Sequence, residues 1–302
     1  MLVRLFAVLA WLACSLSVAA AGELRRETVA SPHLGRDFSY LIYLPDGYQP
    51  GTTYPVVYLL HGAGSDEQAW SQQGQIQQNL DSLVASRAIP PVVVVMPGCV
   101  GCWWVDGARD KAETAFWQDF VPAVERRYDL AVTRAGRFVA GLSAGGYGAI
   151  RFALRYPDRL AGAAAFSPAV YTETVPSFSA ARSQPPFLDA NGQFDQKAWD
   201  AQNYPQWLPS YFAQGHRLPV YLVSGDNDRF GIAPETMKLF MALFARQPDQ
   251  TELRIIDGDH NWDVWASALR DSLVFLLKNA PPPQVATPRN SVVLAGRGPQ
   301  RP

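Results

Sequence analysis

The chain has 302 residues, of which 48% are hydrophobic and 18% charged, and its 26 Lys and Arg almost balance its 27 Asp and Glu. Low charge with 12% aromatic residues excludes a largely disordered chain, and the lack of a long basic run argues against a nucleic-acid-binding protein. Three cysteines are too few for a disulfide scaffold, and the length suits one α/β domain.

Residues 1–21 predict a cleaved signal peptide. Arg4 precedes an apolar core at residues 5–13, and the three alanines at 19–21 supply the small side chains that signal peptidase requires. An uncleaved membrane anchor remains the alternative, because residues 5–21 approach the length that spans a bilayer. Nothing later in the sequence resembles a membrane span, so we expect no stable membrane insertion after cleavage. The protein is therefore expected to be secreted or periplasmic.

The rest of the chain alternates between apolar runs and helical stretches. The apolar runs predict strands that are buried on both faces, as in a parallel sheet, at residues 38–44, 55–60, 91–96, 138–142, 160–166, 219–223 and 253–256. Helices are predicted at residues 76–86, 113–128, 144–156, 234–245 and 262–277. This alternation predicts an α/β fold with a mostly parallel, doubly wound sheet. Functional residues should then lie on loops at the carboxyl ends of the strands.

Two segments fall outside this alternation. Residues 170–218 are rich in proline and aromatic side chains and have no clear period, which is typical of an inserted lid. Residues 280–302 are proline-rich and polar and predict a disordered tail. The sequence thus predicts one domain at residues 22–279 that carries a lid.

A serine-centred turn follows the fourth predicted strand. The sequence GLSAGG at residues 141–146 is the Gly-x-Ser-x-Gly motif between a strand and a helix. The serine of such a turn has a strained backbone, which is tolerated only if the residues two positions away lack side chains. We therefore expect Ser143 to be a nucleophile, against the alternative of a glycine-rich helix start needed only for packing. No phosphate loop or dinucleotide-binding motif supports nucleotide binding.

A serine nucleophile needs a base and an acid that orients the base. In folds with this motif the chain order is serine, acid and histidine. His260 follows the last predicted strand and precedes a helix, so we expect it to be the base. The acid is expected at Asp228, on the loop after residues 219–223, with Asp226 as the alternative.

The sequence HGAG at residues 61–64 follows the second predicted strand and has the composition of a loop that donates to an oxyanion. We expect the amides of Ala63 and Ala144 to form an oxyanion hole, with Gly62 as the alternative to Ala63, and His61 to be structural. Losing one such donor typically lowers the rate about 100- to 1,000-fold.

Two neighbouring features follow the third predicted strand. Cys99 and Cys102 predict a short disulfide that braces the loop, since a redox pair would open a helix and a zinc site would need more ligands. Trp103 and Trp104 are expected to bind substrate. Aromatic residues of the lid are expected to extend this wall, namely Tyr204, Trp207 and Tyr211. Trp262 and Trp265 are expected to belong to the core.

These motifs resemble the esterase family that includes esterase D (S-formylglutathione hydrolase), feruloyl esterases and mycobacterial mycolyltransferases. The similar pieces extend over residues 38–277 and read VVYLLHGAG, VVVVMPG, GLSAGGYGA, SGDNDRF and GDHNWDVW. The resemblance implies an α/β-hydrolase fold, a triad of Ser143, Asp228 and His260, and carboxylic-ester chemistry with no metal or other cofactor. The chain departs from the family where Gly98 and Cys99 replace a frequent Asp–Gly pair.

The function expected on these grounds is that of an exported serine esterase that forms an acyl-enzyme. Its substrate is expected to be a small-molecule or carbohydrate ester, either an acylated carbohydrate or a feruloyl-type aryl ester, on the basis of resemblance and export. Two alternatives remain open. An acyltransferase would pass the acyl group to a sugar hydroxyl, and a non-catalytic binding module would use the same fold without chemistry.

Overall fold

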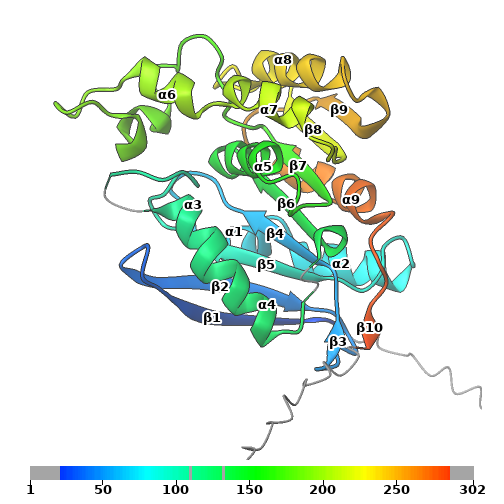
Figure 1. Cartoon of the computed structure of the whole chain (residues 1–302). Helices are drawn as coiled ribbons and strands as arrows, with labels where there is room; N and C mark the ends of the chain where they lie inside the picture. Colours follow the sequence, from blue (N-terminus) through cyan, green and yellow to red (C-terminus); the bar gives the residue numbers. More distant parts are fainter. Residues whose placement is uncertain (1–20, 109–110, 131–132, 286–302) are drawn as a thin grey trace, which may run out of the picture.

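The computed structural model describes residues 21–108, 111–130 and 133–285. Its centre is an eight-stranded sheet with the order β1-β2-β5-β4-β6-β7-β8-β9 (Figure 1). The strands are β1 (Glu23–Ser31), β2 (Arg36–Leu44), β4 (Val56–Leu60), β5 (Val93–Gly98), β6 (Arg137–Leu142), β7 (Gly162–Phe166), β8 (Val220–Gly225) and β9 (Thr251–Ile256). Strands β4 to β9 pair in parallel, and β2 joins β5 and β1 in antiparallel register. The predicted mostly parallel α/β sheet is therefore confirmed.

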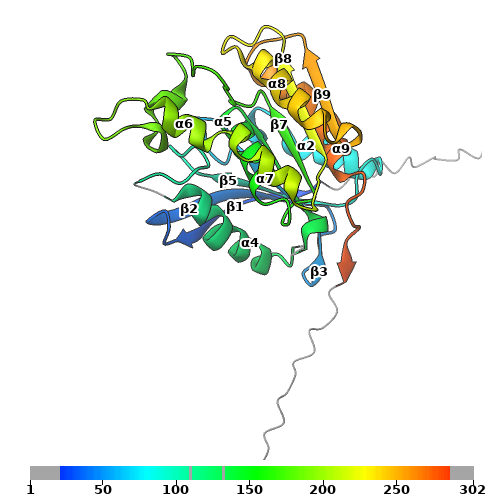
Figure 2. The ribbon, with the colours of Figure 1, turned by 45° about the horizontal axis from the view of Figure 1, so that its top comes forward.

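Helices cover both faces of the sheet (Figures 1 and 2). Side chains of β4 alternate between two hydrophobic clusters, because successive residues of a strand point to opposite faces. Val57 and Leu59 pack in the cluster that contains residues of α2 (Ile76–Ala85) and α9 (Trp262–Leu277). Tyr58 and Leu60 pack in the other cluster, whose helices are α3 (Ala112–Ala115), α4 (Val121–Arg127), α5 (Ala144–Arg155) and α8 (Ile232–Phe244). A five-residue π-helix, Phe116–Phe120, joins α3 to α4 within one predicted helix.

Strand β1 was not predicted from the sequence. It pairs along its whole length with β2, as in Glu23 with Leu44 and Ser31 with Arg36. Five of its nine residues are exposed because it is an edge strand, and its charged sequence ELRRETVAS therefore lacks the apolar run of a buried strand.

The segment between β7 and β8 packs onto α5. It contains α6 (Gln196–Gln202), α7 (Leu208–Ala213) and several short 3₁₀ turns. Trp199 of α6 stacks on Tyr147 of α5 with ring centroids 5.4 Å apart, and Gln202 accepts hydrogen bonds from Tyr147 and Arg151. Much of the segment is therefore joined to the body of the protein through α5.

The structure describes only small parts of the two terminal segments for which the sequence makes predictions. The predicted signal peptide lies almost entirely outside the described residues. Of the predicted disordered tail, residues 280–285 are described, and β10 (Gln284–Val285) pairs with β3 (Thr52–Thr53). Two residues of the predicted tail, Gln284 and Val285, therefore have a strand partner, and disorder of the tail stays a prediction. Residues 286–302 lie outside the described part of the chain.

Candidate active site

Ser143 occupies a strained turn between β6 and α5. Its backbone angles are φ 53° and ψ −115°, a region that side chains other than glycine rarely adopt. Three hydrogen bonds hold this geometry. The N–H of Ser143 donates to Phe166 O at 2.8 Å, and its carbonyl accepts from Tyr147 N at 2.9 Å and Ala169 N at 3.1 Å. The turn therefore keeps its conformation through partners on both β7 and α5.

The glycines on either side of Ser143 are required by close backbone approach. A Cβ at Gly141 would lie 2.3 Å from the carbonyl oxygen of Gly145. A Cβ at Gly145 would lie 2.5 Å from the carbonyl oxygens of both Leu60 and His61. These distances explain why both glycines of the Gly-x-Ser-x-Gly motif are needed in this chain.

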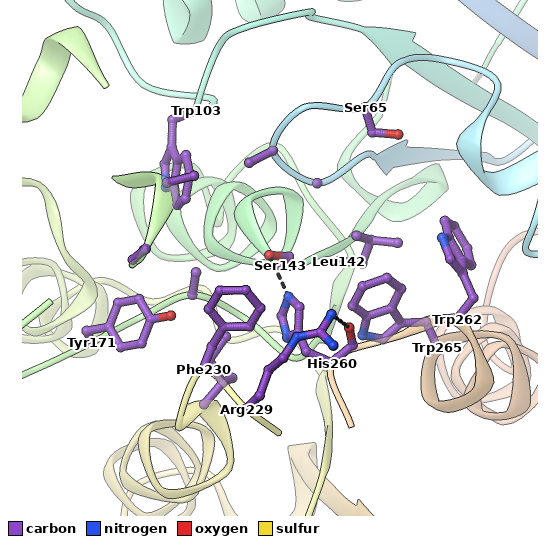
Figure 3. A pocket seen from close by; sticks show the side chains of 16 residues that line it. Ser65, Trp103, Leu142, Ser143, Tyr171, Arg229, Phe230, His260, Trp262 and Trp265 are labelled. Carbon is purple, nitrogen blue, oxygen red and sulfur yellow. Dashed lines mark hydrogen bonds between the residues drawn. The ribbon is translucent and has the colours of Figure 1, made fainter. Parts of the chain in front are cut away.

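The structure brings Ser143, His260 and Asp228 together, although they follow three different strands. Figure 3 shows the contact between Ser143 and His260. His260 Nε2 lies 3.0 Å from Ser143 Oγ, and His260 Nδ1 lies 2.7 Å from Asp228 Oδ2. The Asp228 side chain is fully buried, and its other oxygen accepts the N–H of Phe230 at 3.0 Å. A proton on Nδ1 satisfies the carboxylate and leaves Nε2 free to accept from the serine hydroxyl.

The alternative acid, Asp226, has different partners. Its side chain accepts hydrogen bonds from Gly258 N at 3.0 Å and from Asn227 Nδ2 at 2.9 Å, and the residue is exposed. It therefore braces the turn against the loop after β9 and makes no contact with His260. The geometry favours Asp228 over Asp226 as the partner of the imidazole.

Two aromatic rings flank the imidazole of His260. Phe230 lies with its ring centroid 4.7 Å away, and Trp265 lies 5.0 Å away with its plane nearly perpendicular. Trp265 is itself fixed, because its indole N–H donates to Ser167 Oγ at 3.1 Å. These contacts restrict the orientation of the ring that faces Ser143.

The HGAG loop lies directly against the serine turn. A Cβ at Gly62 would lie 2.7 Å from Leu142 Cδ1 and 3.4 Å from Ser143 Cβ. Ala63 lines the pocket beside Ser143. Ala144 is the first residue of α5, so its N–H has no acceptor within the helix. Both predicted oxyanion donors are thus next to the serine, one in the loop and one at the helix start.

His61 is a buried residue of the same loop. Its Nδ1 lies 2.7 Å from the carbonyl of Gly62, and its carbonyl accepts the indole N–H of Trp104 at 3.2 Å. Burial lowers the pKa of His61 below its ordinary value and keeps the ring neutral near pH 7. These contacts agree with the structural role that the sequence suggested for His61.

The two tryptophans after β5 point in different directions. Trp103 lines the pocket, whereas Trp104 is fully buried and does not line it. The backbone of Trp104 has φ 57°, and its side chain lies against α5, where a Cβ at Gly148 would come within 2.6 Å of it. The prediction that Trp104 binds substrate is therefore wrong, because this residue is part of the core.

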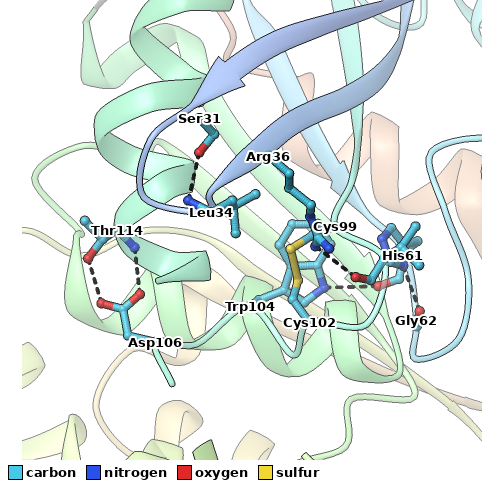
Figure 4. The surroundings of a disulfide bond; sticks show 11 residues. Ser31, Leu34, Arg36, His61, Gly62, Cys99, Cys102, Trp104, Asp106 and Thr114 are labelled. Atoms are coloured by element: carbon cyan, nitrogen blue, oxygen red, sulfur yellow. Dashed lines mark hydrogen bonds between the residues drawn. A yellow bond between two sulfur atoms is a disulfide. The ribbon is translucent and has the colours of Figure 1, made fainter. Parts of the chain in front are cut away.

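Cys99 and Cys102 form the predicted disulfide just before these tryptophans (Figure 4). The N–H of Cys102 also donates to Cys99 O at 3.1 Å, and Arg36 donates to the carbonyl of Val100 at 3.0 Å. The loop that carries Trp103 to the pocket is thus closed by one covalent bond and two hydrogen bonds.

The aromatic side chains expected to extend the substrate wall lie elsewhere. Tyr204 and Tyr211 are buried away from the pocket, and Trp207 lies under the guanidinium of Arg155, whose carbon is 4.6 Å from the ring centroid. This part of the wall prediction is wrong because the segment packs on α5. Trp265 belongs to the hydrophobic core, as expected, and Trp262 packs against the same cluster. Both residues also line the pocket.

The resulting pocket has a volume of about 310 Å³. Figure 3 shows Ser143 and His260 at its centre, with Trp103, Tyr171 and Phe230 toward one end and Trp262 and Trp265 toward the other. Tyr171, Arg229 and Phe230 were not predicted from the sequence. The last two directly follow Asp228, so their place next to the expected acid was the available signal.

Among the described residues, no three His, Cys, Asp or Glu side chains form a cluster arranged to bind a metal. In the same part of the chain, no helix combines the length and hydropathy needed to cross a bilayer.

Comparison with known proteins identifies the family. A family model described as "Putative esterase" matches residues 31–276. The chain belongs to this esterase family. Among curated proteins, this esterase-family chain is 28% identical over 151 residues to an endo-1,4-beta-xylanase/feruloyl esterase of Xylanibacter ruminicola, a match that covers 45% of this chain and 20% of the relative. It is 32% identical over 135 residues to Esterase Rv1288 of Mycobacterium tuberculosis, covering 42% and 28% of the two chains. The matches thus cover less than a third of the length of each of these relatives.

Solved structures show the same fold over a larger part of the chain. A ferulic acid esterase superposes with a TM-score of 0.74 at 24% identity, covering 86% of this chain and 99% of that protein. FphF, a fluorophosphonate-binding serine hydrolase of Staphylococcus aureus, superposes with a TM-score of 0.70 at 18% identity, covering 85% and 99%. The fold of this esterase-family chain is therefore the α/β-hydrolase fold.

Proposed function

We propose that this protein is an exported serine esterase that hydrolyses carboxylic esters through an acyl-enzyme. The observation that carries the proposal is the continuous contact from Ser143 Oγ to His260 Nε2 at 3.0 Å and from His260 Nδ1 to Asp228 Oδ2 at 2.7 Å. A serine hydroxyl is a weak nucleophile unless a base removes its proton, and a base within hydrogen-bond distance meets that requirement. Membership of the esterase family points to the same chemistry.

In the proposed first step, Ser143 Oγ attacks the ester carbonyl carbon while His260 Nε2 takes the hydroxyl proton. The Asp228 carboxylate stabilises the imidazolium that forms, and the amides of Ala63 and Ala144 donate to the oxyanion. Collapse of the tetrahedral intermediate breaks the bond to the alcohol, which leaves with the proton from His260. Water then attacks the acyl-serine by the same route, and the carboxylic acid is released.

The pocket supports an ester with an apolar or aromatic part. Aromatic side chains form much of its lining, and they come from four different loops or helices. Large aromatic side chains bind rings and sugar faces by burial and stacking. A feruloyl-type aryl ester or an acylated carbohydrate fits this lining. The printed names of a curated relative and of a similar structure, a xylanase/feruloyl esterase and a ferulic acid esterase, support the same substrate class.

The proposal also keeps the domain organisation inferred from the sequence. Residues 1–21 act as an export signal, residues 22–279 form the hydrolase domain, and residues 170–218 act as a lid that contributes to one wall. Tyr171, Ser179 and Ala180 are the residues of that segment which line the pocket.

Replacement of Ser143 by Ala in the purified mature chain tests the proposal. Wild-type protein should hydrolyse 4-nitrophenyl acetate and methyl ferulate, and S143A should lose at least 1,000-fold in kcat/KM while keeping the same thermal unfolding temperature. Detection of an acyl group on Ser143 by mass spectrometry after a brief reaction would support the acyl-enzyme. Retained turnover in S143A would refute the serine mechanism, and transfer to an added sugar that exceeds hydrolysis would indicate an acyltransferase instead. A folded wild-type protein that hydrolyses neither of these two esters would indicate a binding module.

A further inference from the structure

Arg229 is the one permanently charged side chain among the described residues that line the pocket. It follows the acid Asp228 directly, and its side chain is 62% exposed. The guanidinium Nη2 lies 3.4 Å from the carbonyl of His260, which places a positive charge at the rim beside the imidazole (Figure 3). Neither the proton transfers nor the oxyanion donors described above use this group.

Contacts within the loops fix the position of Arg229. Its own N–H donates to Asp259 Oδ1 at 2.8 Å, and its Nη1 contacts Asp259 Oδ2 at 3.1 Å. The guanidinium carbon also lies 5.6 Å from the ring centroid of Phe230. These contacts orient the planar group, while several of its five N–H donors remain without a partner in the described residues.

The nearby carboxylates are engaged with the backbone. Asp259 accepts two main-chain N–H groups through Oδ1, from Arg229 and from His260, and these hydrogen bonds lower its pKa. Asp226 accepts the N–H of Gly258, and Asp228 is buried against His260. None of these three carboxylates lines the pocket, so the charged group that a substrate meets at this part of the rim is the guanidinium of Arg229, which is paired with Asp259 at 3.1 Å and is the more exposed partner.

We infer that Arg229 is a specificity-determining residue that favours esters whose alcohol part carries a carboxylate. The inference rests on the proposed function, because the leaving alcohol takes its proton from His260 Nε2 and therefore departs on the side of His260. Arg229 lies beside that residue, so its guanidinium faces the alcohol part of the substrate and can donate to a carboxylate there. A hydroxy acid or an acidic sugar is an alcohol of this kind.

The neighbouring rim is apolar and fits the rest of such an alcohol. Phe178 is 63% exposed, and its ring centroid lies 5.6 Å from that of Phe230. A ring or sugar face packed on these side chains would hold its carboxylate toward Arg229. The combination of an aromatic surface with a fixed cation is therefore suited to an acidic ring compound.

Two matched pairs of esters test the inference. The alcohol-side pair is 4-acetoxybenzoate and methyl 4-acetoxybenzoate, and the acyl-side pair is 4-nitrophenyl hydrogen adipate and its methyl ester. The readout is the ratio of kcat/KM for the acid to kcat/KM for its neutral methyl ester, so that intrinsic reactivity cancels when variants are compared. For the alcohol-side pair this ratio should fall about 3- to 5-fold in R229Q, the upper part of the range expected for an exposed ion pair, and further in R229E. R229K should keep most of the preference.

The control is Arg25→Gln, because Arg25 also forms an exposed ion pair, with Glu23, but lies on β1 away from the pocket. This variant should leave the ratio unchanged. The wild-type preference should also shrink in about 0.5 M NaCl, since salt screens exposed charges. An unchanged ratio in folded R229Q would overturn the inference, and a change confined to the acyl-side pair would overturn the assignment to the alcohol. Either result leaves the serine mechanism intact if S143A is inactive, whereas an active S143A would refute the proposed function itself.

Discussion

Replacement of Asp228 by asparagine changes one atom of the buried side chain that contacts His260. In the wild type, Asp228 Oδ1 accepts the N–H of Phe230 at 3.0 Å and Oδ2 lies 2.7 Å from His260 Nδ1. The side-chain amide of D228N has one oxygen, and this oxygen must face the Phe230 N–H, because the opposite orientation would set two donors against each other. The NH₂ group then faces Nδ1, which must accept, and the imidazole proton moves to Nε2. An imidazole protonated at Nε2 cannot take the proton of Ser143.

The structure therefore predicts a loss of about 10⁴-fold in kcat for D228N, or about 5.4 kcal/mol of transition-state stabilisation. The matched variant D226N should stay within about 3-fold of wild type, because the oxygen of its amide can still accept from Gly258 and Asn227. Initial rates of 4-nitrophenyl acetate hydrolysis, with thermal unfolding as the check on folding, measure both. A larger loss in D226N, or a loss below tenfold in folded D228N, would refute the assignment of the acid.

Three further changes have expected outcomes. Gly145→Ala should lower the free energy of unfolding by about 1–3 kcal/mol and reduce activity, because its Cβ would meet backbone oxygens at 2.5 Å. The control Gly215→Ala should be nearly neutral, because its Cβ would have nothing within 4 Å. Equal losses of unfolding free energy in the two variants, measured by urea denaturation, would contradict this reasoning. Replacing Cys99 and Cys102 together by Ser opens a loop of sequence separation 3, so the unfolding free energy should fall by only about 2 kcal/mol. The KM should rise, because the loop that holds Trp103 loses its cross-link. An unchanged KM would show that the disulfide does not support the pocket. Burial lowers the pKa of His61, so, as the pH falls, His61 is protonated in the unfolded chain at a higher pH than in the folded chain. The contribution of His61 to the unfolding free energy is therefore lost as the pH falls below about 6.5. The change in unfolding free energy between pH 7 and pH 5 should therefore be smaller in His61→Gln, and an unchanged pH dependence would argue against this contribution.

The sequence predicted the parts of the site that depend on short stretches of chain. Gly141, Ser143 and Gly145 share one tight turn, so the constraint that links them is local and readable. His260 was predicted because few histidines follow Ser143 and this one comes directly after a strand. The same holds for the buried strands, whose apolar runs reflect burial on both faces of the sheet.

The errors concern side chains whose direction depends on tertiary packing. Trp103 and Trp104 are adjacent in sequence, but a positive φ at Trp104 sends one ring to the pocket and the other beneath α5. Strand β1 escaped prediction because an edge strand needs few apolar residues. Tyr204 and Tyr211 were expected to line the substrate pocket, yet their segment packs on α5. No periodic pattern within the segment indicates this packing. The choice between Asp226 and Asp228 likewise depended on how the loops after β8 and β9 meet.

The pairing of β10 with β3 has a practical consequence. Strand β3 comes just before β4 begins, whereas the HGAG loop starts where β4 ends, so β3 and β10 lie at the end of the strands opposite the HGAG loop (Figure 1). A surface linker or fusion partner attached at Val285 starts on the far side of the molecule from the mouth of the pocket. Immobilisation through Val285 should therefore preserve access for bulky or polymeric esters, whereas attachment through the exposed loop at Phe178 would obstruct it.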